Sequence, residues 1–272
     1  MHPSRSEIDF CLLIPCYNNF TGLISSLKSV VYPADKFLIV VVDDGSKEAV
    51  TEERIQKEIG NAKPVVVIQN EKNLGITATL NNGLRWIEEN TNSKYIARLD
   101  CGDICAEERF VIQVQYMDGH PEVGLIGSWC IFEDKKTFEK YHYKTPLDHL
   151  DILKAMHFRN VFIHPTTIFR TMSLSKVGNY PISFEHAEDY AFFWKLINYQ
   201  PSHIIDRFLV TCEVNLSGIS YSNRIKQLKS RWKIVKTYGS YKIMKIIGFI
   251  RILLLYIIPK SLVLRLKKMI AD

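Results

Sequence analysis

Apolar residues in the first hundred positions form short unbroken blocks, separated by longer segments of mixed character. The four apolar blocks cover residues 10–14, 37–42, 64–68 and 95–99. Unbroken blocks of this length are typical of strands that are buried on both faces of a sheet. The segments between them have the apolar spacing of helices and cover residues 21–31, 48–59 and 76–90. This alternation predicts an α/β fold with a mostly parallel, doubly wound sheet.

A polar loop follows each of the four expected strands. In chain order the loops read PCYNN, DDGS, NEKNLG and DCGD. Ligands of doubly wound sheets sit beyond the carboxyl ends of the strands, so these loops are expected to meet at one edge. A single polar loop is as readily a plain turn as part of a site, because strand ends need polar turns. Four such loops at one edge favour a ligand site.

The second half of the chain has a less regular pattern. Residues 107–120 and 147–158 predict helices, and residues 123–132 predict a strand. An aromatic helix is expected to begin at Glu188 and Asp189, where the helix dipole favours negative charge. These two acids are therefore interpreted either as helix-terminal charges or as members of a site.

Composition narrows the class of protein. With 272 residues and 47% hydrophobic content, the chain can form a sizeable core. Its six cysteines include no CxxC pair, which argues against a zinc site and a disulfide framework. The first ten residues contain no apolar segment of signal-peptide length, so a cytoplasmic location is expected.

Charge is distributed unevenly between the body of the chain and its end. Residues 224–272 contain 13 Lys and Arg and one acid, whereas the rest contains 22 basic and 28 acidic residues. A basic segment rich in Ile and Leu suits an anionic lipid surface better than nucleic acid. Its apolar run, residues 246–258, is shorter than the ~20 residues of a spanning helix. An interfacial helix is expected, and a helix packed on the rest of the protein is the alternative.

Read together, the loop motifs resemble those of a known enzyme family. IPCYNN, VVDDGS, NLGITATLNNG, ARLDCGDI, HPTTIFR and AEDYAFFWKL occur in the order seen in family-2 glycosyltransferases of the GT-A fold. The resemblance covers about residues 10–220 and is to bacterial members that build O-antigen and capsule repeat units. It implies an inverting transfer of a sugar from a nucleotide-diphosphate sugar, expected to be a UDP-sugar, to an acceptor hydroxyl.

The resemblance also implies roles for individual residues. Asp189 occupies the family's catalytic-base position, and Glu188 is expected to orient the base or the acceptor. His164 of HPTT either lines the site or is a structural histidine. The nucleotide-sugar site is expected to comprise Pro15, Tyr17, Asp43, Asp44, Asn73, Gly75, Asn81, Arg98 and Asp100.

Two positions depart from the family's pattern of metal ligands. Members commonly carry Asp-x-Asp-Asp where this chain has DCGD, so Gly102 replaces an acid that is often a ligand. Asp100 and Asp103 remain as expected ligands of Mn²⁺ or Mg²⁺, which needs few protein carboxylates. Many relatives also have a histidine where this chain has Asn215. We expect altered coordination; a catalytically inactive nucleotide-sugar-binding or scaffold protein is the alternative.

These expectations define an organisation and a set of partners. A catalytic domain is expected over residues 1–221, with a nucleotide-sugar half at about 1–105 and an acceptor half at about 106–221. Residues 222–272 are expected to form a basic amphipathic tail that associates with the membrane. The resemblance implies a lipid-linked saccharide acceptor at the inner face of the bacterial plasma membrane, with no nucleic acid as partner.

Overall fold

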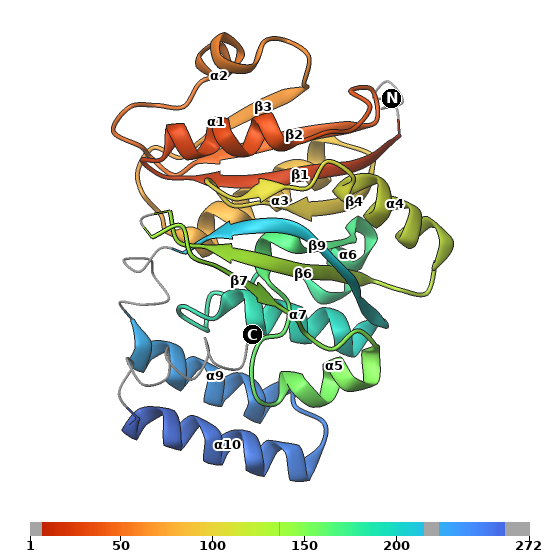
Figure 1. Ribbon diagram of the computed structural model, residues 1–272, viewed down its shortest axis with the longest axis vertical. Helices are drawn as coiled ribbons and strands as arrows, with labels where there is room; N and C mark the ends of the chain where they lie inside the picture. The colour runs from red at the N-terminus through yellow and green to blue at the C-terminus, as the bar shows by residue number, and fades with distance from the viewer. Residues whose placement is uncertain (1–6, 136, 215–222, 259–272) are drawn as a thin grey trace.

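The first half of the chain forms the parallel part of the sheet (Figure 1). The computed structural model describes residues 7–135, 137–214 and 223–258. Here β1 pairs in parallel with β2 and β4, and β2 pairs in parallel with β3. The strands are β1 (Ile8–Cys16), β2 (Phe37–Asp43), β3 (Val65–Gln69) and β4 (Ser93–Arg98). The helices between them are α1 (Phe20–Ser29), α2 (Glu52–Ile59) and α3 (Ile76–Asn90), so the alternation expected from the sequence is confirmed.

Side chains of β1 fill the core on both faces of the sheet. Phe10, Leu12 and Ile14 point into one hydrophobic cluster, and Cys11 and Leu13 point into the other. All five are fully buried. Since successive strand residues face opposite sides, an apolar residue at every position is what two covered faces require.

The second half of the chain extends the sheet with strands of both directions. β8 (Ile168–Arg170) pairs antiparallel with β4 and with β6 (Leu125–Glu133). β9 (Ser202–Glu213) then runs parallel to β6, and the short β5 (Ile104–Cys105) pairs antiparallel with β9. β7 (Lys140–Tyr143) forms a hairpin with β6. The strand order is β3-β2-β1-β4-β8-β6-β9-β5, with β7 beside β6.

The helices of the second half cover this part of the sheet. α7 is the most buried of them, because its aromatic residues Phe192, Phe193 and Trp194 are fully enclosed. The helices are α4 (Arg109–Gly119), α5 (His149–Met156), α6 (Leu174–Val177) and α7 (Glu188–Tyr199), with 3-10 turns at His164–Thr166 and Thr171–Ser173. The aromatic helix expected at Glu188 is confirmed.

Two helices at the end of the described chain form an outer layer beneath α5 and α7 (Figure 1). They are α9 (Arg224–Tyr238) and α10 (Lys242–Ile257). α9 buries Leu228, Ile234 and Val235, and its residue Gln227 donates a hydrogen bond to the carbonyl of His186, 3.2 Å away. One face of this segment therefore packs on the rest of the protein. This was the alternative to an interfacial helix in the sequence analysis.

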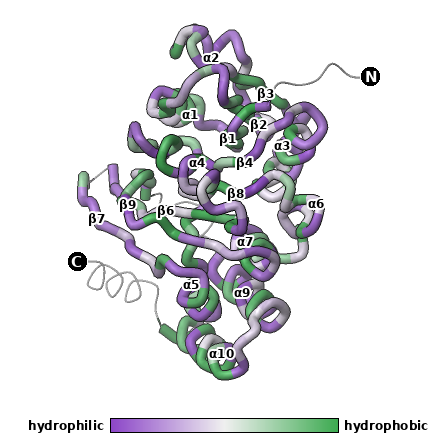
Figure 2. The backbone as a smooth tube through the Cα atoms, turned by 90° about the vertical axis from the view of Figure 1, so that its right-hand side faces the viewer, coloured by the Kyte–Doolittle hydropathy of each residue, from purple (hydrophilic) through white to green (hydrophobic). Residues whose placement is uncertain are grey.

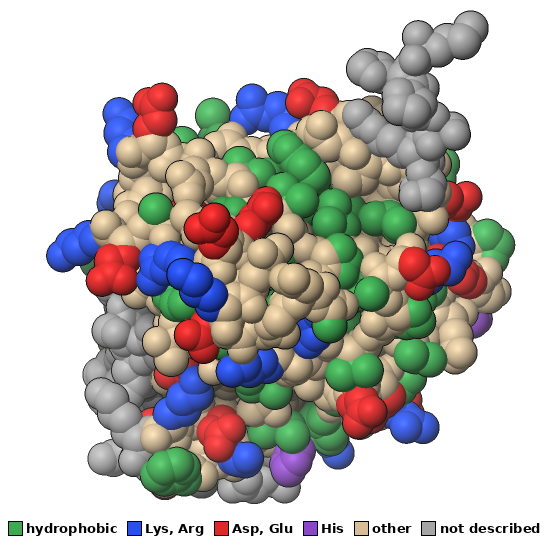
Figure 3. All heavy atoms as spheres, turned by 90° about the horizontal axis from the view of Figure 1, so that it is seen from above, with side chains coloured by type: hydrophobic (Ala, Val, Ile, Leu, Met, Phe, Trp, Pro, Cys, Tyr) green, Lys and Arg blue, Asp and Glu red, His purple; other side chains and the backbone are tan. Residues whose placement is uncertain are grey.

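The opposite face of α10 is apolar and exposed. Figure 2 shows α10 as a largely hydrophobic segment at the end of the molecule opposite α2. The exposed side chains recur every three or four residues and form one stripe, called here the α10 stripe: Ile243, Ile246, Ile247, Ile250, Leu253, Leu254 and Ile257. By contrast, Lys, Arg, Asp and Glu are interspersed on the face seen from the α2 end (Figure 3). None of the helices in the described part of the chain combines the length and apolarity needed to cross a bilayer.

Candidate active site

The carboxyl ends of β1, β2 and β4 meet at one edge of the sheet, as the sequence predicts. The pairing places Cys16 beside Asp43 and Leu13 beside Arg98. Pro15 is the penultimate residue of β1, and Tyr17, which follows the strand, has half of its side chain exposed. An exposed aromatic ring at a strand end is available to stack on a flat ligand such as a nucleobase.

The two acids that follow β2 hold the neighbouring loops in shape. Asp43 accepts hydrogen bonds from the backbone nitrogens of Ser46 (3.2 Å) and Val50 (3.0 Å). Asp44 accepts from the backbone nitrogens of Leu74 (2.8 Å) and Gly75 (3.0 Å). Asp44 also accepts from the side-chain amide of Asn70, at 2.8 Å. Both carboxylates therefore brace these loops from within, since each is almost fully buried.

Residues just before and within α3 lie beside these loops and connect them to the second half of the chain. Asn73 is exposed in the loop that Asp44 holds. Gly75 has φ +84°, a backbone conformation that favours glycine, and it precedes the first turn of α3. Asn81 exchanges two hydrogen bonds of 2.9 Å with the backbone of Tyr180. Asn81 thus fixes the loop that precedes α7 against the nucleotide-sugar half.

Arg98 is a fully buried cation at the centre of the site. Its guanidinium forms a 2.7 Å ion pair with Asp100 and also donates to the carbonyl of Leu13. Its Nε lies 3.2 Å from Nε2 of His164. A buried guanidinium needs such partners, because an unpaired charge in a core costs several kcal/mol. Arg98 therefore orients Asp100 towards the strand edge.

His164 has the contacts of a structural histidine. Its Nε2 atom lies within hydrogen-bonding distance of both Arg98 Nε (3.2 Å) and the Tyr180 hydroxyl (2.8 Å). Burial and the Arg98 charge hold the pKa of His164 well below its usual value, so the ring is neutral. This nitrogen is already used within the protein. Of the two interpretations of HPTT, the contacts favour the structural one.

Backbone conformation and a neighbouring carboxylate explain the glycine in DCGD. Gly102 has φ +103°, and a Cβ added there would lie 2.9 Å from Oε2 of Glu213. A side chain at this position would be strained and would meet an acid that is already present. Glu213 comes from the end of β9 and forms a 2.6 Å ion pair with Lys135. Sequence reasoning missed this pair, because nothing local marks two residues so far along the chain.

Asp103 points away from solvent. Its carboxyl accepts a hydrogen bond from the backbone nitrogen of Glu213 at 2.9 Å, which ties DCGD to β9. Burial, followed by the charge of Asp100, raises the pKa of Asp103 to about 8. Asn215, the other position at which the chain departs from the family's ligands, lies outside the described residues.

The described residues fit a cation that is held mainly by substrate. They include no group of three or more His, Cys, Asp or Glu side chains able to hold a metal ion by themselves. Asp100 is the open carboxylate of DCGD, with 42% of its side chain exposed. Mg²⁺ commonly binds through one or two carboxylates together with substrate phosphates and waters. The donor set therefore suits a bridging cation rather than an all-protein metal site.

Asp189 lies in the first turn of α7 with its carboxylate held on both sides. It accepts a 2.9 Å hydrogen bond from the amide of Asn160 and a 2.7 Å hydrogen bond from the backbone nitrogen of Tyr190. Burial raises the pKa of Asp189, while these two donors and Arg231 of α9 oppose the rise. The result is an oriented carboxylate whose proton affinity exceeds that of an exposed aspartate, which suits a general base.

Glu188 is buried and its Oε2 atom has no hydrogen-bond partner among the described residues. Burial, Asp189 and Asp100 together raise the pKa of Glu188 to about 7. Asp100 also raises the pKa of Asp189. The structure thus brings carboxylates from the end of β4 and the start of α7 within electrostatic reach of one another. An unpaired buried oxygen is unusual in a folded protein and indicates a place where a ligand binds.

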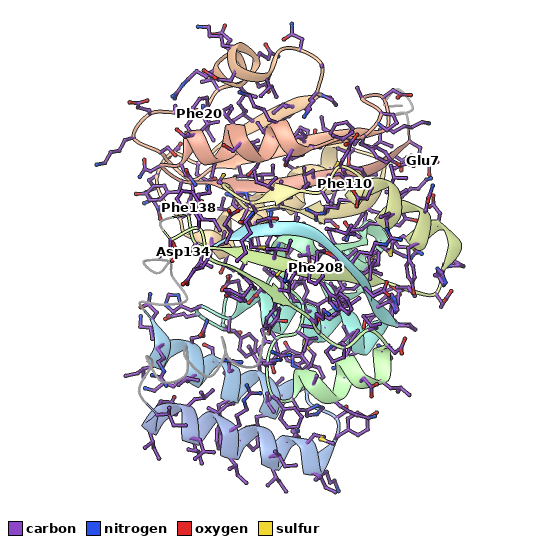
Figure 4. The ribbon with its side chains drawn as sticks, viewed as in Figure 1. Glu7, Phe20, Phe110, Asp134, Phe138 and Phe208 are labelled. Carbon is purple, nitrogen blue, oxygen red and sulfur yellow. The ribbon has the colours of Figure 1, made fainter. Side chains whose placement is uncertain are left out.

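A turn at the rim of the site was not foreseen from the sequence. Figure 4 labels Asp134 and Phe138 in the turn between β6 and β7, on the same side of the molecule as Phe20 at the start of α1. Phe138 has φ +58° and 75% of its side chain is exposed. An exposed aromatic residue in a turn is suited to contact a ligand, yet its sequence context carries no motif.

The fold and these loops are those of the GT-A type. The model of the family "Glycosyl transferase family 2" matches residues 11–178, and the chain belongs to this family. The chain is therefore a glycosyltransferase, as the motifs implied.

Two relatives illustrate the family's range. The chain is 31% identical over 194 residues to the amylovoran biosynthesis glycosyltransferase AmsE of Erwinia amylovora, covering 70% of each chain. It is 27% identical over 180 residues to the UDP-Gal:alpha-D-GlcNAc-diphosphoundecaprenol beta-1,3-galactosyltransferase of Escherichia coli, covering 63% of each.

Two solved structures confirm the fold. S. aureus TarS 1-349 in complex with UDP-GlcNAc superimposes with a TM-score of 0.65 at 18% identity, over 88% of this chain and 69% of TarS. The mannosyltransferase PcManGT from Pyrobaculum calidifontis, in complex with GDP-Man and Mn²⁺, gives a TM-score of 0.61 at 17% identity, over 88% and 67%. The predicted GT-A architecture is confirmed, whereas the roles of individual residues stay predictions.

Proposed function

We propose that this glycosyltransferase moves a sugar from a UDP-sugar to a hydroxyl of a lipid-linked saccharide, with inversion, during synthesis of a bacterial surface polysaccharide such as O-antigen or capsule. The observation that carries the proposal is that Asp100 lies within electrostatic reach of Glu188 and Asp189, because a donor held at Asp100 would then lie near the proposed base. The activities of the amylovoran and diphosphoundecaprenol relatives support the pathway and the acceptor class. UDP-GlcNAc bound to the TarS structure supports the donor class.

Asp189 is the proposed base. The acceptor oxygen forms a bond to the anomeric carbon while its proton passes to the Asp189 carboxylate. The bond from that carbon to the diphosphate breaks, and the nucleoside diphosphate leaves with the electron pair. Asn160 and the Tyr190 backbone nitrogen keep the base oriented during this step. The raised pKa of Asp189 strengthens it as a proton acceptor near neutral pH.

Glu188 is the proposed partner of the acceptor sugar. Its Oε2 atom has no hydrogen-bond partner among the described residues, and with a pKa of about 7 it can donate or accept a hydrogen bond. A second acceptor hydroxyl placed there would satisfy the buried oxygen. This contact would fix the acceptor relative to Asp189. The proposed base and the residue that positions the acceptor would then be neighbours in one turn of α7.

The remaining site residues are proposed to hold the donor. Tyr17 would stack on the nucleobase of the donor. The wall of the donor pocket would be shaped by Asp43, Asp44, Asn73, Gly75 and Asn81. Mn²⁺ or Mg²⁺ would be held by Asp100 and the donor diphosphate, where it would offset the charge that develops on the leaving group. Asp103 stays a predicted ligand, although its oxygen is used by the Glu213 backbone nitrogen.

The α10 stripe and the basic residues around it are proposed to hold the enzyme on the inner face of the plasma membrane. Apolar residues of the stripe would enter the acyl boundary, and nearby cations would contribute about 1 kcal/mol each at an anionic surface. Because α9 packs on α7, removal of the tail would expose the core, and substitutions of the stripe are the cleaner test. Ile247→Asp with Leu254→Asp should abolish sedimentation with anionic liposomes. Val111→Asp on α4 is the matched control and should sediment as wild type does.

The experiment that tests the transferase proposal separates donor binding from turnover. Wild-type protein is titrated calorimetrically with a panel of UDP- and GDP-sugars, with Mn²⁺ and with chelator. Transfer of radiolabelled sugar to short-chain saccharide-diphosphate lipids is then measured. UDP-sugar binding with transfer supports the proposal. Binding without transfer to any acceptor supports the inactive, scaffold alternative, and a preference for GDP-sugars contradicts the proposed donor.

A further inference from the structure

Three arginines from distant parts of the chain lie close to α7, the helix that carries Asp189. Arg159 follows α5, Arg231 lies in the middle of α9, and Arg251 lies on α10. The Arg159 guanidinium donates to the Tyr143 hydroxyl at 2.6 Å and lies 5.1 Å from the centre of its ring. We call Arg159, Arg231 and Arg251 the arginine triad.

Contacts of neighbouring residues bring the members of the triad together. The Tyr190 ring, 6.0 Å from the Arg231 guanidinium, donates its hydroxyl to the carbonyl of Met156, three residues before Arg159. Trp232, next to Arg231, stacks on Phe249 of α10 with 4.1 Å between ring centres. Burial and the charges of Arg231 and Arg159 lower the pKa of Arg251. Burial raises the pKa of Tyr143, and the charges of the three arginines oppose that rise. Like charges brought this close repel each other, so the arrangement is unfavourable unless an anion compensates it.

No carboxylate forms a salt bridge with the triad within residues 7–135, 137–214 and 223–258. The triad is also accessible, because none of its members is fully buried: Arg159 and Arg231 are half-buried, and Arg251 lies at the surface with part of its side chain enclosed. Guanidinium groups present forked pairs of N–H donors that match phosphate oxygens. Three reachable guanidiniums without a salt bridge among the described residues therefore form a site for a multiply charged oxyanion.

The position of the triad suggests which oxyanion it binds. Arg231 lies near enough to Asp189 to lower its pKa, and its guanidinium is 6.0 Å from the ring centre of Tyr190 in the same helix. Arg251 follows Ile247 of the α10 stripe by one helical turn, so it borders the apolar face. The triad thus lies between the proposed base and the surface proposed to face lipid.

We propose that the arginine triad binds the diphosphate of the lipid-linked acceptor and so places the acceptor sugar beside Asp189. In that arrangement the lipid chain runs along the α10 stripe and the saccharide extends towards α7. The inference rests on the proposed function, because an acceptor attached to a lipid through a diphosphate carries its charge between the sugar and the lipid chain. The site would select acceptors by their charged link in addition to their sugar.

A first experiment tests the site without any transfer reaction. Farnesyl diphosphate is titrated into full-length protein, and Arg231→Gln and Arg251→Gln are compared with wild type. Each substitution should weaken binding roughly 10-fold to 100-fold, because each removes hydrogen bonds to a charged group. Arg207→Gln, an exposed arginine of β9, is the matched control and should bind as wild type does. Arg251→Gln keeps the test valid if the half-buried Arg231 variant folds poorly.

The second experiment asks whether the site serves the acceptor. Transfer is measured with two soluble acceptors of the same sugar, one with a diphosphate and a short alkyl chain and one with the alkyl chain alone. The triad variants should raise KM for the diphosphate acceptor and leave donor affinity and KM for the uncharged acceptor unchanged. Equal effects on both acceptors, or none, overturn the inference. Variants that lose only binding to anionic phospholipid vesicles would show that the triad binds headgroups, which also overturns it.

The two experiments separate failure of the triad from failure of the enzyme. If wild type binds farnesyl diphosphate through the triad but transfers no sugar, the proposed function is wrong and the oxyanion site stands. If transfer occurs and the diphosphate makes no difference to binding or KM, the triad inference alone is wrong.

Discussion

Asp43 and Asp44 of the nucleotide-sugar half and Glu188 of the acceptor half differ in how their oxygens are used. Asp43 and Asp44 are buried and fully engaged with loop amides. Glu188 is also buried, yet its Oε2 atom lacks a hydrogen-bond partner among the described residues. Since a buried polar atom without a partner costs about 1–3 kcal/mol, the first arrangement stabilises the fold and the second does not. Acids of the first kind shape a pocket, and acids of the second kind are available to substrate.

This comparison predicts that the largest loss of activity comes from the acceptor half. Asp189→Asn removes the proton acceptor and keeps the shape of the side chain, but its NH2 group cannot accept one of the two hydrogen bonds that the carboxylate accepts. Transfer should fall by a factor of about 10² to 10⁴, whereas UDP-sugar affinity should stay within about twofold. Steady-state kinetics and calorimetry measure the two quantities, with Asp206→Asn on the exposed side of β9 as control. Wild-type turnover in Asp189→Asn would remove the base from its proposed position.

The nucleotide-sugar half should respond through stability instead. Asp44→Ala leaves the backbone nitrogens of Leu74 and Gly75 and the amide of Asn70 without their acceptor. We expect the free energy of unfolding to fall by about 2–4 kcal/mol. Donor affinity should fall with it, because the pocket wall loosens. Denaturant unfolding measures the free energy of unfolding. An unchanged midpoint would show that Asp44 does not stabilise these loops.

Asn160→Ala tests the positioning of the base. The amide of Asn160 stabilises the charged form of Asp189, so its loss should raise the pKa of that carboxyl further. The acidic limb of the kcat profile should move to higher pH, and kcat near neutral pH should fall about tenfold. Asn90→Ala at the end of α3 is the control. A uniform loss of activity at every pH would indicate a structural role for Asn160 instead.

Asp103→Asn should have the smallest effect on transfer, and its effect on stability should depend on pH. The folded carboxyl has a pKa of about 8, above its ordinary value of 3.8, so the folded state holds a proton that the unfolded chain has lost. Stability of the wild type should therefore fall as pH rises from about 4 towards 8. The amide variant keeps an acceptor for the Glu213 nitrogen and carries no charge.

Melting temperatures between pH 5 and pH 8 measure this slope. The Asp103→Asn curve should be flatter than the wild-type curve, and the gain in melting temperature should be largest near pH 8, at about 2–4 °C for each kcal/mol. Parallel curves would contradict the raised pKa.

The sequence predicted the parallel half of the sheet because every element there is local and strongly patterned. Apolar blocks such as residues 37–42 and the helix at residues 76–90 need no distant partner to be recognised. β8 was not foreseen, since three residues carry too little pattern and their antiparallel pairing with β4 depends on chain far away.

The features of the site also fall into those that the sequence predicts and those that it does not. Loops at strand ends were predictable from the order of strands and from the family resemblance. Contacts across long sequence separations were not, and they include Glu213 beside Gly102, Asn81 with the Tyr180 backbone, and the arginine triad. Each depends on where β9, α9 and α10 return to the sheet, which no local pattern encodes.

The configuration of the product tests the central claim most directly. Wild-type enzyme, supplied with an α-linked UDP-sugar and a soluble saccharide-diphosphate acceptor, should yield a β-linked product, because a single displacement assisted by Asp189 inverts the anomeric carbon. The anomeric proton coupling in the NMR spectrum distinguishes the two configurations. A β-linkage formed by wild type and lost in Asp189→Asn is the predicted result, and an α-linked product would contradict the account.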